Sequence, residues 1–220
     1  MFRGCATRGR IVSPLPAALA RVAVIPVLVI EEARQAAALA RALCAGGLTV
    51  LEVTLRTDHA LAALEAMRAA VPEALVGAGT LTSPQDFVRA RNAGAQFAVS
   101  PGLTPALAQA AASTQLPLLP GVSTATEILL AREAGYDFLK FFPAEQSGGV
   151  AMLQAFAGPF AGVRFCPTGG ITRESAPRYL QLDNVVCVGG SWVAPLAKVR
   201  AGDWAGIEQL AREAARLKTS

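Results

Sequence analysis

The sequence predicts an α/β protein, a (β/α)8 barrel of the TIM type with a short N-terminal helix. Short apolar segments alternate with Ala-rich amphipathic segments, and near-continuous apolar strands between helices are typical of a parallel sheet covered by helices. Eight such units in 220 residues favour a barrel over the alternative, an open doubly wound sheet. A GxGxxG motif, which is typical of many open sheets, does not follow any of the expected strands.

The expected elements follow one another in regular order. Ser13 is suited to cap a helix with Pro14 at its first position, and this helix is expected to reach about residue 22. The expected strands cover residues 23–30, 49–55, 75–80, 97–102, 117–123, 138–143, 164–170 and 185–191. The expected helices after them cover residues 31–45, 58–70, 84–93, 105–113, 124–134, 150–157, 174–180 and about 203–217.

Composition predicts one domain and argues against two classes of partner. With 53% hydrophobic and 16% charged residues, residues 1–220 are expected to form a single barrel domain, in which residues 1–22 are an N-terminal extension and helix. The net charge of +4 is modest and no basic run is interleaved with aromatic residues, so no nucleic acid is expected as a partner. Proline and arginine interrupt the apolar stretch near the N-terminus, and no membrane segment is expected.

The cysteines and the histidine point to a reducing compartment and a metal-free site. Cys5, Cys44, Cys166 and Cys187 form no CxxC pair, so a cytoplasmic location is expected. His59 is the only histidine, whereas catalytic metal sites usually draw on several His and carboxylate ligands. A metal-dependent mechanism is therefore not expected.

Lys140 is the first candidate catalytic residue, because apolar residues flank it on both sides in Phe-Leu-Lys-Phe-Phe. Strand alternation places Lys140 on one face together with Phe138 and Phe142, and this face points into the barrel if the other packs on helices. A buried ammonium is costly and tends to lose its proton, and the free amine is the form that attacks a carbonyl. The alternative interpretation is a structural lysine paired with a carboxylate.

Glu52 is the second candidate, in the expected strand at residues 49–55. It shares a face with Val50 and Thr54, so it too is expected to point into the barrel. A carboxylate beside Lys140 can be an ion-pair partner, and it can equally be the proton shuttle that Schiff-base chemistry needs. The two interpretations are compatible.

Further polar residues and glycines collect at the carboxyl ends of the strands, where barrel enzymes place their sites. Arg56 is suited to hold a carboxylate in a bidentate fork, although an exposed arginine is often only solvated. Gly-Gly pairs end the seventh and eighth strands at residues 169–170 and 189–190. They are suited to bind phosphate through backbone N–H groups, and tight turns are the alternative interpretation.

Six motifs in order connect the chain to a known family. They are LEVTLRT at 51–57, VGAGT at 76–80, SPGLT at 100–104, FLKFFPAE at 138–145, RFCPTGG at 164–170 and GGSW at 189–192. From about residue 24 to residue 217 the sequence resembles the bacterial 2-keto-3-deoxy-6-phosphogluconate (KDPG) aldolases, which are also 4-hydroxy-2-oxoglutarate (KHG) aldolases. The resemblance implies a class I aldolase, a lyase of carbohydrate metabolism in the Entner–Doudoroff pathway, with a (β/α)8 fold and a homotrimeric assembly.

The resemblance also implies a role for each residue at a motif position. Lys140 would be the Schiff-base lysine and Glu52 the general acid and base. The implied substrate-binding residues are Arg56 and Thr80 for the pyruvate moiety, Pro101 and Phe142 as pocket lining, Thr168 for the substrate chain, and Gly169, Gly170, Gly190 and Ser191 for the phosphate. The implied partner is a phosphorylated 2-keto acid, cleaved without a metal or cofactor.

Other functions stay open at this point. The preferred substrate is KDPG, its galactonate epimer or KHG. A metal-dependent sugar-phosphate epimerase or class II aldolase on the same barrel is compatible with the phosphate loops, although His59 is a poor start for a metal site. A non-catalytic barrel that binds a phosphorylated sugar acid would also use those loops, but it leaves an inward Lys140 and Glu52 unexplained.

Overall fold

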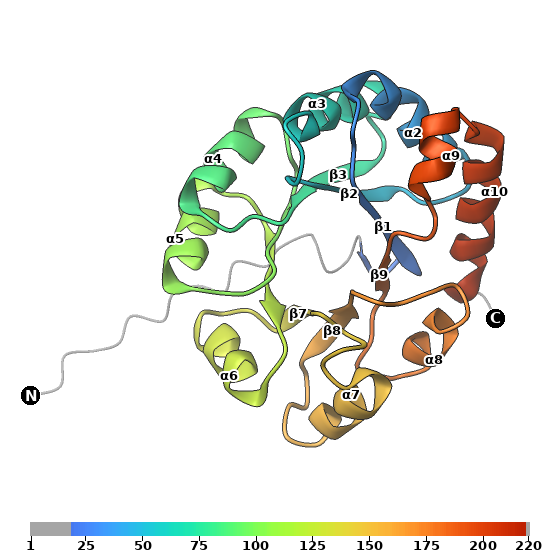
Figure 1. Ribbon diagram of the computed structural model, residues 1–220. Helices are drawn as coiled ribbons and strands as arrows, with labels where there is room; N and C mark the ends of the chain where they lie inside the picture. The colour runs from blue at the N-terminus through green and yellow to red at the C-terminus, as the bar shows by residue number, and fades with distance from the viewer. Residues whose placement is uncertain (1–18, 219–220) are drawn as a thin grey trace, which may run out of the picture.

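The computed structural model describes residues 19–218 and has an α/β fold, in which helices surround a curled parallel sheet (Figure 1). Its strands are β1 (Val24–Leu28), β2 (Val50–Thr54), β3 (Leu75–Gly79), β4 (Ala98–Val99), β5 (Leu118–Leu119), β6 (Gly121–Val122), β7 (Phe138–Phe141), β8 (Arg164–Pro167) and β9 (Val188–Gly190). They form a six-stranded sheet in the order β5-β4-β3-β2-β1-β9 and a three-stranded sheet in the order β6-β7-β8. Each of these neighbouring pairs is parallel.

Helices lie outside the strands, as the alternating pattern predicts. They are α2 (Ala33–Ala45), α3 (Ala60–Ala70), α4 (Pro84–Asn92), α5 (Pro105–Thr114), α6 (Ala125–Glu133), α7 (Gly149–Ala157), α8 (Ala176–Leu180), α9 (Leu196–Ala201) and α10 (Trp204–Ala215), followed by the 3-10 turn η1 (Arg216–Lys218). Most expected helices agree with these to within two residues at each end. Among the described helices, none is long and apolar enough to cross a membrane.

The structure corrects the expected elements at two places. The fifth expected strand is divided into β5 and β6, because Pro120 between them has no N–H to donate to a ladder. The Pro120 carbonyl still accepts a hydrogen bond from the Lys140 N–H at 2.8 Å. Helix α9 was not expected, because it has only six residues and Val199 is the only buried one among them. The expected N-terminal helix at residues 14–22 falls mostly outside the described residues.

Alternation along the strands divides the buried side chains into two clusters. Leu51 and Val53 of β2 belong to the larger cluster, which includes the buried faces of the helices, whereas Val50 belongs to the smaller one on the inner face of the sheet. The inner cluster consists of Leu19, Val22, Ile25, Val50, Phe97, Val99, Leu119, Phe138, Cys166 and Cys187. Inner positions nearer the carboxyl ends of the strands carry the candidate site.

Candidate active site

Lys140 lies on the inner face of β7, with its strand neighbours Gly121 of β6 and Cys166 of β8 on either side. All four residues of β7 are buried, and Lys140 is only 6% exposed. Its position is fixed by the backbone, because its N–H donates to the Pro120 carbonyl between β5 and β6 and the flanking side chains of β7 pack in both clusters. The other lysines have different surroundings: Lys198 pairs with Asp203 and Lys218 is exposed.

Glu52 lies on the inner face of β2 and is 3% exposed. Its Oε1 atom is 3.6 Å from the Lys140 Nζ atom, so the structure brings the two predicted residues together as a buried ion pair. That distance is too long for a hydrogen bond, and Oε1 has no hydrogen-bond partner among the described residues. A buried polar atom without a partner is rare in folded proteins and is typical of sites that receive a ligand or water.

Glycines on the inner face make space for polar side chains, a role that was not predicted from the sequence. A Cβ atom on Gly79 of β3 would overlap the Glu52 carboxylate. A Cβ atom on Gly189 of β9 would likewise overlap the Thr168 hydroxyl. The signal was present in the sequence, because glycine inside an apolar strand often marks a close approach of another group.

Phe142 and Pro101 border the same region. The ring centroid of Phe142 is 5.0 Å from the Lys140 Nζ atom, within cation–π range. Pro101 follows β4, and its carbonyl lies where a Cβ atom on Gly121 would be. Both residues are half-buried.

Arg56 and Thr80 follow β2 and β3 at the rim. The Arg56 guanidinium is exposed and has no ion-pair partner within residues 19–218. Thr80 has a φ of 63°, which is rare for a β-branched residue and costs about 1–3 kcal/mol. Backbone strain of this kind tends to occur at ligand sites, where it fixes one orientation of a side chain.

The predicted phosphate residues follow β8 and β9. Gly169 and Gly170 both have positive φ values, 104° and 76°, an arrangement that glycine adopts without strain. Gly170 and Ser191 are exposed, whereas Gly190 is buried within β9. A Cβ atom on Gly190 would overlap the ring of Trp192, so packing of that ring already requires glycine there.

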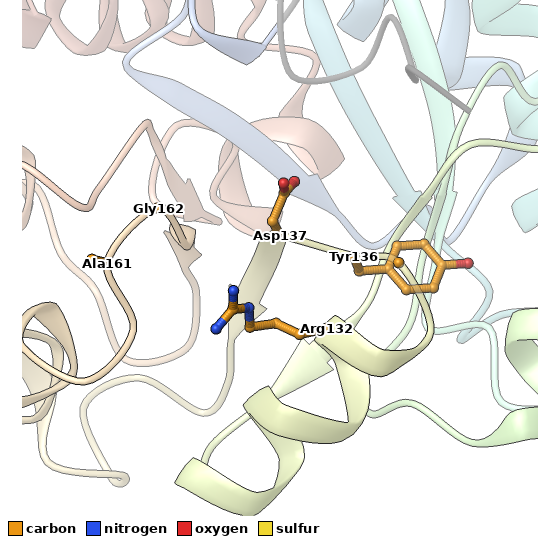
Figure 2. A pocket seen from close by; sticks show the side chains of 6 residues that line it. Arg132, Tyr136, Asp137, Ala161 and Gly162 are labelled. Carbon is orange, nitrogen blue, oxygen red and sulfur yellow. The ribbon is translucent and has the colours of Figure 1, made fainter. Parts of the chain in front are cut away.

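Two surface hollows lie away from these residues. Figure 2 shows the first, with Arg132 at the end of α6, Tyr136 and Asp137 before β7, and Ala161 and Gly162 before β8. The second hollow shares Ala161 and Gly162 with the first and is lined mainly by residues 160–164 and 181–184. Because these residues precede β8 or β9, both hollows lie at the amino ends of the strands, opposite the rim that carries Arg56 and Thr80. Within the described part of the chain, no three His, Cys, Asp or Glu side chains cluster to hold a metal ion.

Comparisons with known proteins give one consistent family. The model of the family "Aldolase: KDPG and KHG aldolase" matches residues 16–210. A relative from Escherichia coli K12, named KHG/KDPG aldolase, is 52% identical over 191 residues, covering 87% of this chain and 90% of the relative. A relative from Dickeya dadantii, named 2-dehydro-3-deoxy-phosphogluconate aldolase, is 51% identical with the same coverage.

Solved structures agree with the sequence relatives. The KDPG aldolase of Legionella pneumophila, with pyruvate captured as a covalent carbinolamine, is 46% identical and superimposes with a TM-score of 0.88. That similarity covers 91% of this chain and 97% of the other. The KDPG aldolase of Zymomonas mobilis ZM4, solved with 3-phosphoglycerate, has a TM-score of 0.88 and 49% identity, covering 93% and 97% of the two chains.

Proposed function

The chain belongs to the KDPG and KHG aldolase family, whose named members are lyases. We propose that it is a class I aldolase that cleaves KDPG to pyruvate and glyceraldehyde 3-phosphate. The observation that carries the proposal is Lys140, buried on the inner face of the sheet beside the Glu52 carboxylate. The covalent carbinolamine of pyruvate in the Legionella relative supports it, because such an adduct requires an amine nucleophile.

The proposed reaction begins at the Lys140 amine. A proton first passes from the Lys140 ammonium to Glu52, which leaves a free amine. The amine lone pair attacks the C2 carbonyl of the substrate. The nitrogen then loses a proton and the carbonyl oxygen gains one, which gives a carbinolamine. The hydroxyl then leaves as water, which needs a second proton and gives the iminium cation. We assign the donation and recovery of these protons to Glu52, which is supported by the 3.6 Å distance from its Oε1 atom to Nζ and by the lack of a hydrogen-bond partner for Oε1 among the described residues.

Carbon–carbon cleavage follows because the iminium nitrogen can accept an electron pair. Removal of the C4 hydroxyl proton lets that oxygen form the aldehyde, while the C3–C4 bond electrons move through C3 to the nitrogen. Glyceraldehyde 3-phosphate leaves, and the remaining enamine takes a proton at C3. Water then hydrolyses the iminium, which frees pyruvate and restores the Lys140 amine. The iminium is the electron sink, so no step calls for a metal ion or cofactor.

We assign the surrounding residues to substrate binding. Arg56 and Thr80 at the rim would hold the pyruvate carboxylate, with Pro101 and Phe142 lining the pocket and Thr168 facing the substrate chain. The free cation of Arg56 and the fixed orientation of Thr80 support this assignment. Gly169, Gly170, Gly190 and Ser191 would hold the phosphate, and the two consecutive glycines with positive φ support this role.

Trapping with borohydride tests the covalent step. Incubation with pyruvate and borohydride is expected to add one reduced pyruvate unit to the peptide that contains Lys140 and to abolish activity, because reduction makes the Schiff base permanent. Lys140→Met should prevent labelling, whereas Lys198→Met should not. Mass spectrometry of the digested protein measures the label. An unlabelled Lys140 in active enzyme would contradict the mechanism, and binding without any turnover would instead favour a non-catalytic barrel.

Two substitutions test the chemistry and the position of Glu52. Glu52→Gln is expected to lower kcat about 10²–10⁴-fold, the usual contribution of acid–base catalysis. Gly79→Ala is expected to lower kcat as well, because its methyl group would occupy the place of the carboxylate. Gly158→Ala is the matched control, since a Cβ atom there meets no atom within 4 Å. Steady-state kinetics at saturating substrate measure both effects, and an unchanged kcat in Glu52→Gln would remove its assigned role.

The substrate range includes KHG in our proposal, and the galactonate epimer of KDPG is the alternative. KDPG carries a phosphate that KHG lacks, whereas the epimer differs only in stereochemistry near Thr168. We expect kcat/KM to be highest for KDPG. Measuring kcat/KM on the three substrates side by side tests this order, and a higher value for the epimer would reverse the assignment.

We also propose that the two sheets close into a complete (β/α)8 barrel forming one domain. Pro120 alone separates β5 from β6, so the two segments can act as one fifth strand. Bridges between Phe165 and Val185 and between Thr168 and Gly189 connect β8 to the segment that ends in β9. Both junctions support closure, and an experimental structure in which either one is open would contradict it.

A homotrimer in the cytoplasm completes the proposal. The trimer comes from the family resemblance, and exposed leucines on α6 support a subunit contact there, because Leu129 and Leu130 are 50% and 54% exposed. Light scattering is expected to give the mass of three chains, and a monomer at micromolar concentration would contradict the trimer. The free thiols of Cys44, Cys166 and Cys187 are consistent with a reducing compartment.

A further inference from the structure

Tyr179 and Glu145 form a hydrogen bond that none of the steps above uses. Tyr179 lies on α8 and is 1% exposed, and its hydroxyl donates to the Glu145 Oε1 atom at 2.9 Å. Glu145 lies in the segment after β7, 34 residues earlier in the chain. Burial, and then this bond to the carboxylate, raises the pKa of Tyr179, so the hydroxyl stays protonated and keeps its role as a donor.

Glu145 also contacts the turn formed by Gly169 and Gly170. Its backbone N–H donates to the Gly169 carbonyl at 3.1 Å, and the neighbouring Ala144 N–H donates to the Thr168 carbonyl at 2.8 Å. The Cβ and Cγ atoms of Glu145 lie 2.8 Å from the place that a Cβ atom on Gly170 would occupy. The Glu145 side chain therefore lies directly against the Gly170 backbone, and the Tyr179 hydroxyl fixes the other end of that side chain.

Residues 144–145 thus contact the Gly169–Gly170 turn directly, and Tyr179 supports it through Glu145. Two consecutive residues with positive φ have many alternative conformations when both are glycine. Backbone N–H groups bind an anion best when they already point toward it, because ordering them upon binding costs conformational entropy. The conformation of this turn therefore depends on contacts with neighbouring residues.

We propose that Tyr179 and Glu145 are positioning residues, which hold the Gly169–Gly170 turn in its phosphate-binding conformation and thereby set the affinity for phosphorylated substrates. Neither side chain takes part in the chemical steps. The inference rests on the proposed function, because it takes the turn as the phosphate site. It predicts an effect that depends on the phosphate: weaker binding of KDPG, and no change for ligands without a phosphate.

Tyr179→Phe tests the inference with two substrates. The variant retains the ring and loses only the hydroxyl, so the KM for KDPG is expected to rise about fivefold to tenfold, the factor that one hydrogen bond is typically worth, with kcat nearly unchanged. The KM for KHG, and the rate of borohydride trapping with pyruvate, should stay at wild-type values because neither ligand carries a phosphate. Inorganic phosphate should become a weaker competitive inhibitor of KDPG cleavage.

Matched variants separate positioning from general damage. Tyr136→Phe makes the same change at the other tyrosine of the chain, at the opposite end of the strands (Figure 2), and should leave both KM values unchanged. Glu145→Ala should reproduce Tyr179→Phe, whereas Glu145→Gln retains an acceptor for the hydroxyl and should stay near wild type. The double variant Tyr179→Phe/Glu145→Ala should be no worse than either single change, because both remove the same bond.

The outcomes distinguish this inference from the function on which it rests. Equal KM changes for KDPG and KHG, or no change in Tyr179→Phe and Glu145→Ala, would overturn the positioning role. Wild-type protein that cleaves neither substrate and traps no pyruvate would instead contradict the proposed function. Thermal unfolding of each variant confirms that it is folded, and Glu145→Ala serves as the test if Tyr179→Phe does not fold.

Discussion

The ion pair between Lys140 and Glu52 brings two opposite charges onto the inner face of the sheet, where each is less than a tenth exposed. Removing such groups from water is costly, and their mutual attraction offsets that cost only in part when they lack further hydrogen bonds. The pair therefore contributes little to the stability of the fold. The Glu52 Oε1 atom lacks a hydrogen-bond partner among the described residues, which is explained if a substrate or water molecule supplies the missing hydrogen bond.

The space for this pair comes from the backbone of the neighbouring strands. Inner positions nearer the amino ends carry apolar side chains such as Val50 and Phe138, whereas Gly79 lies against the Glu52 carboxylate and Gly189 against Thr168. The same sheet thus has an apolar cluster at one end and a buried charged pair nearer the other, with no change in its parallel pairing. The strands fix the backbone positions of Lys140 and Glu52, and the glycine at residue 79 leaves space for the carboxylate.

The surrounding segments divide the remaining tasks. Groups suited to hold anions lie on the turns after β2, β3, β8 and β9, which end at one rim, while the surface hollows lie at the other end. Turns are less constrained than strands, so their conformation depends on contacts from neighbouring elements. The link from Tyr179 through Glu145 to Gly170 provides such a contact. In our proposal it connects the affinity for phosphorylated substrates to the packing of α8.

The sequence by itself determined the parallel α/β pattern, most element bounds, and the inward orientation of Lys140 and Glu52, because strand periodicity is a local property. The break at Pro120 was not predicted, because it depends on which N–H groups take part in the strand ladder. Helix α9 was not predicted, because it has a single buried side chain. Only the tertiary structure decided which groups meet. The Lys140–Glu52 distance, the close approach at Gly79 and the Tyr179–Glu145 bond join segments far apart in the chain, and no local pattern specifies contacts of that kind.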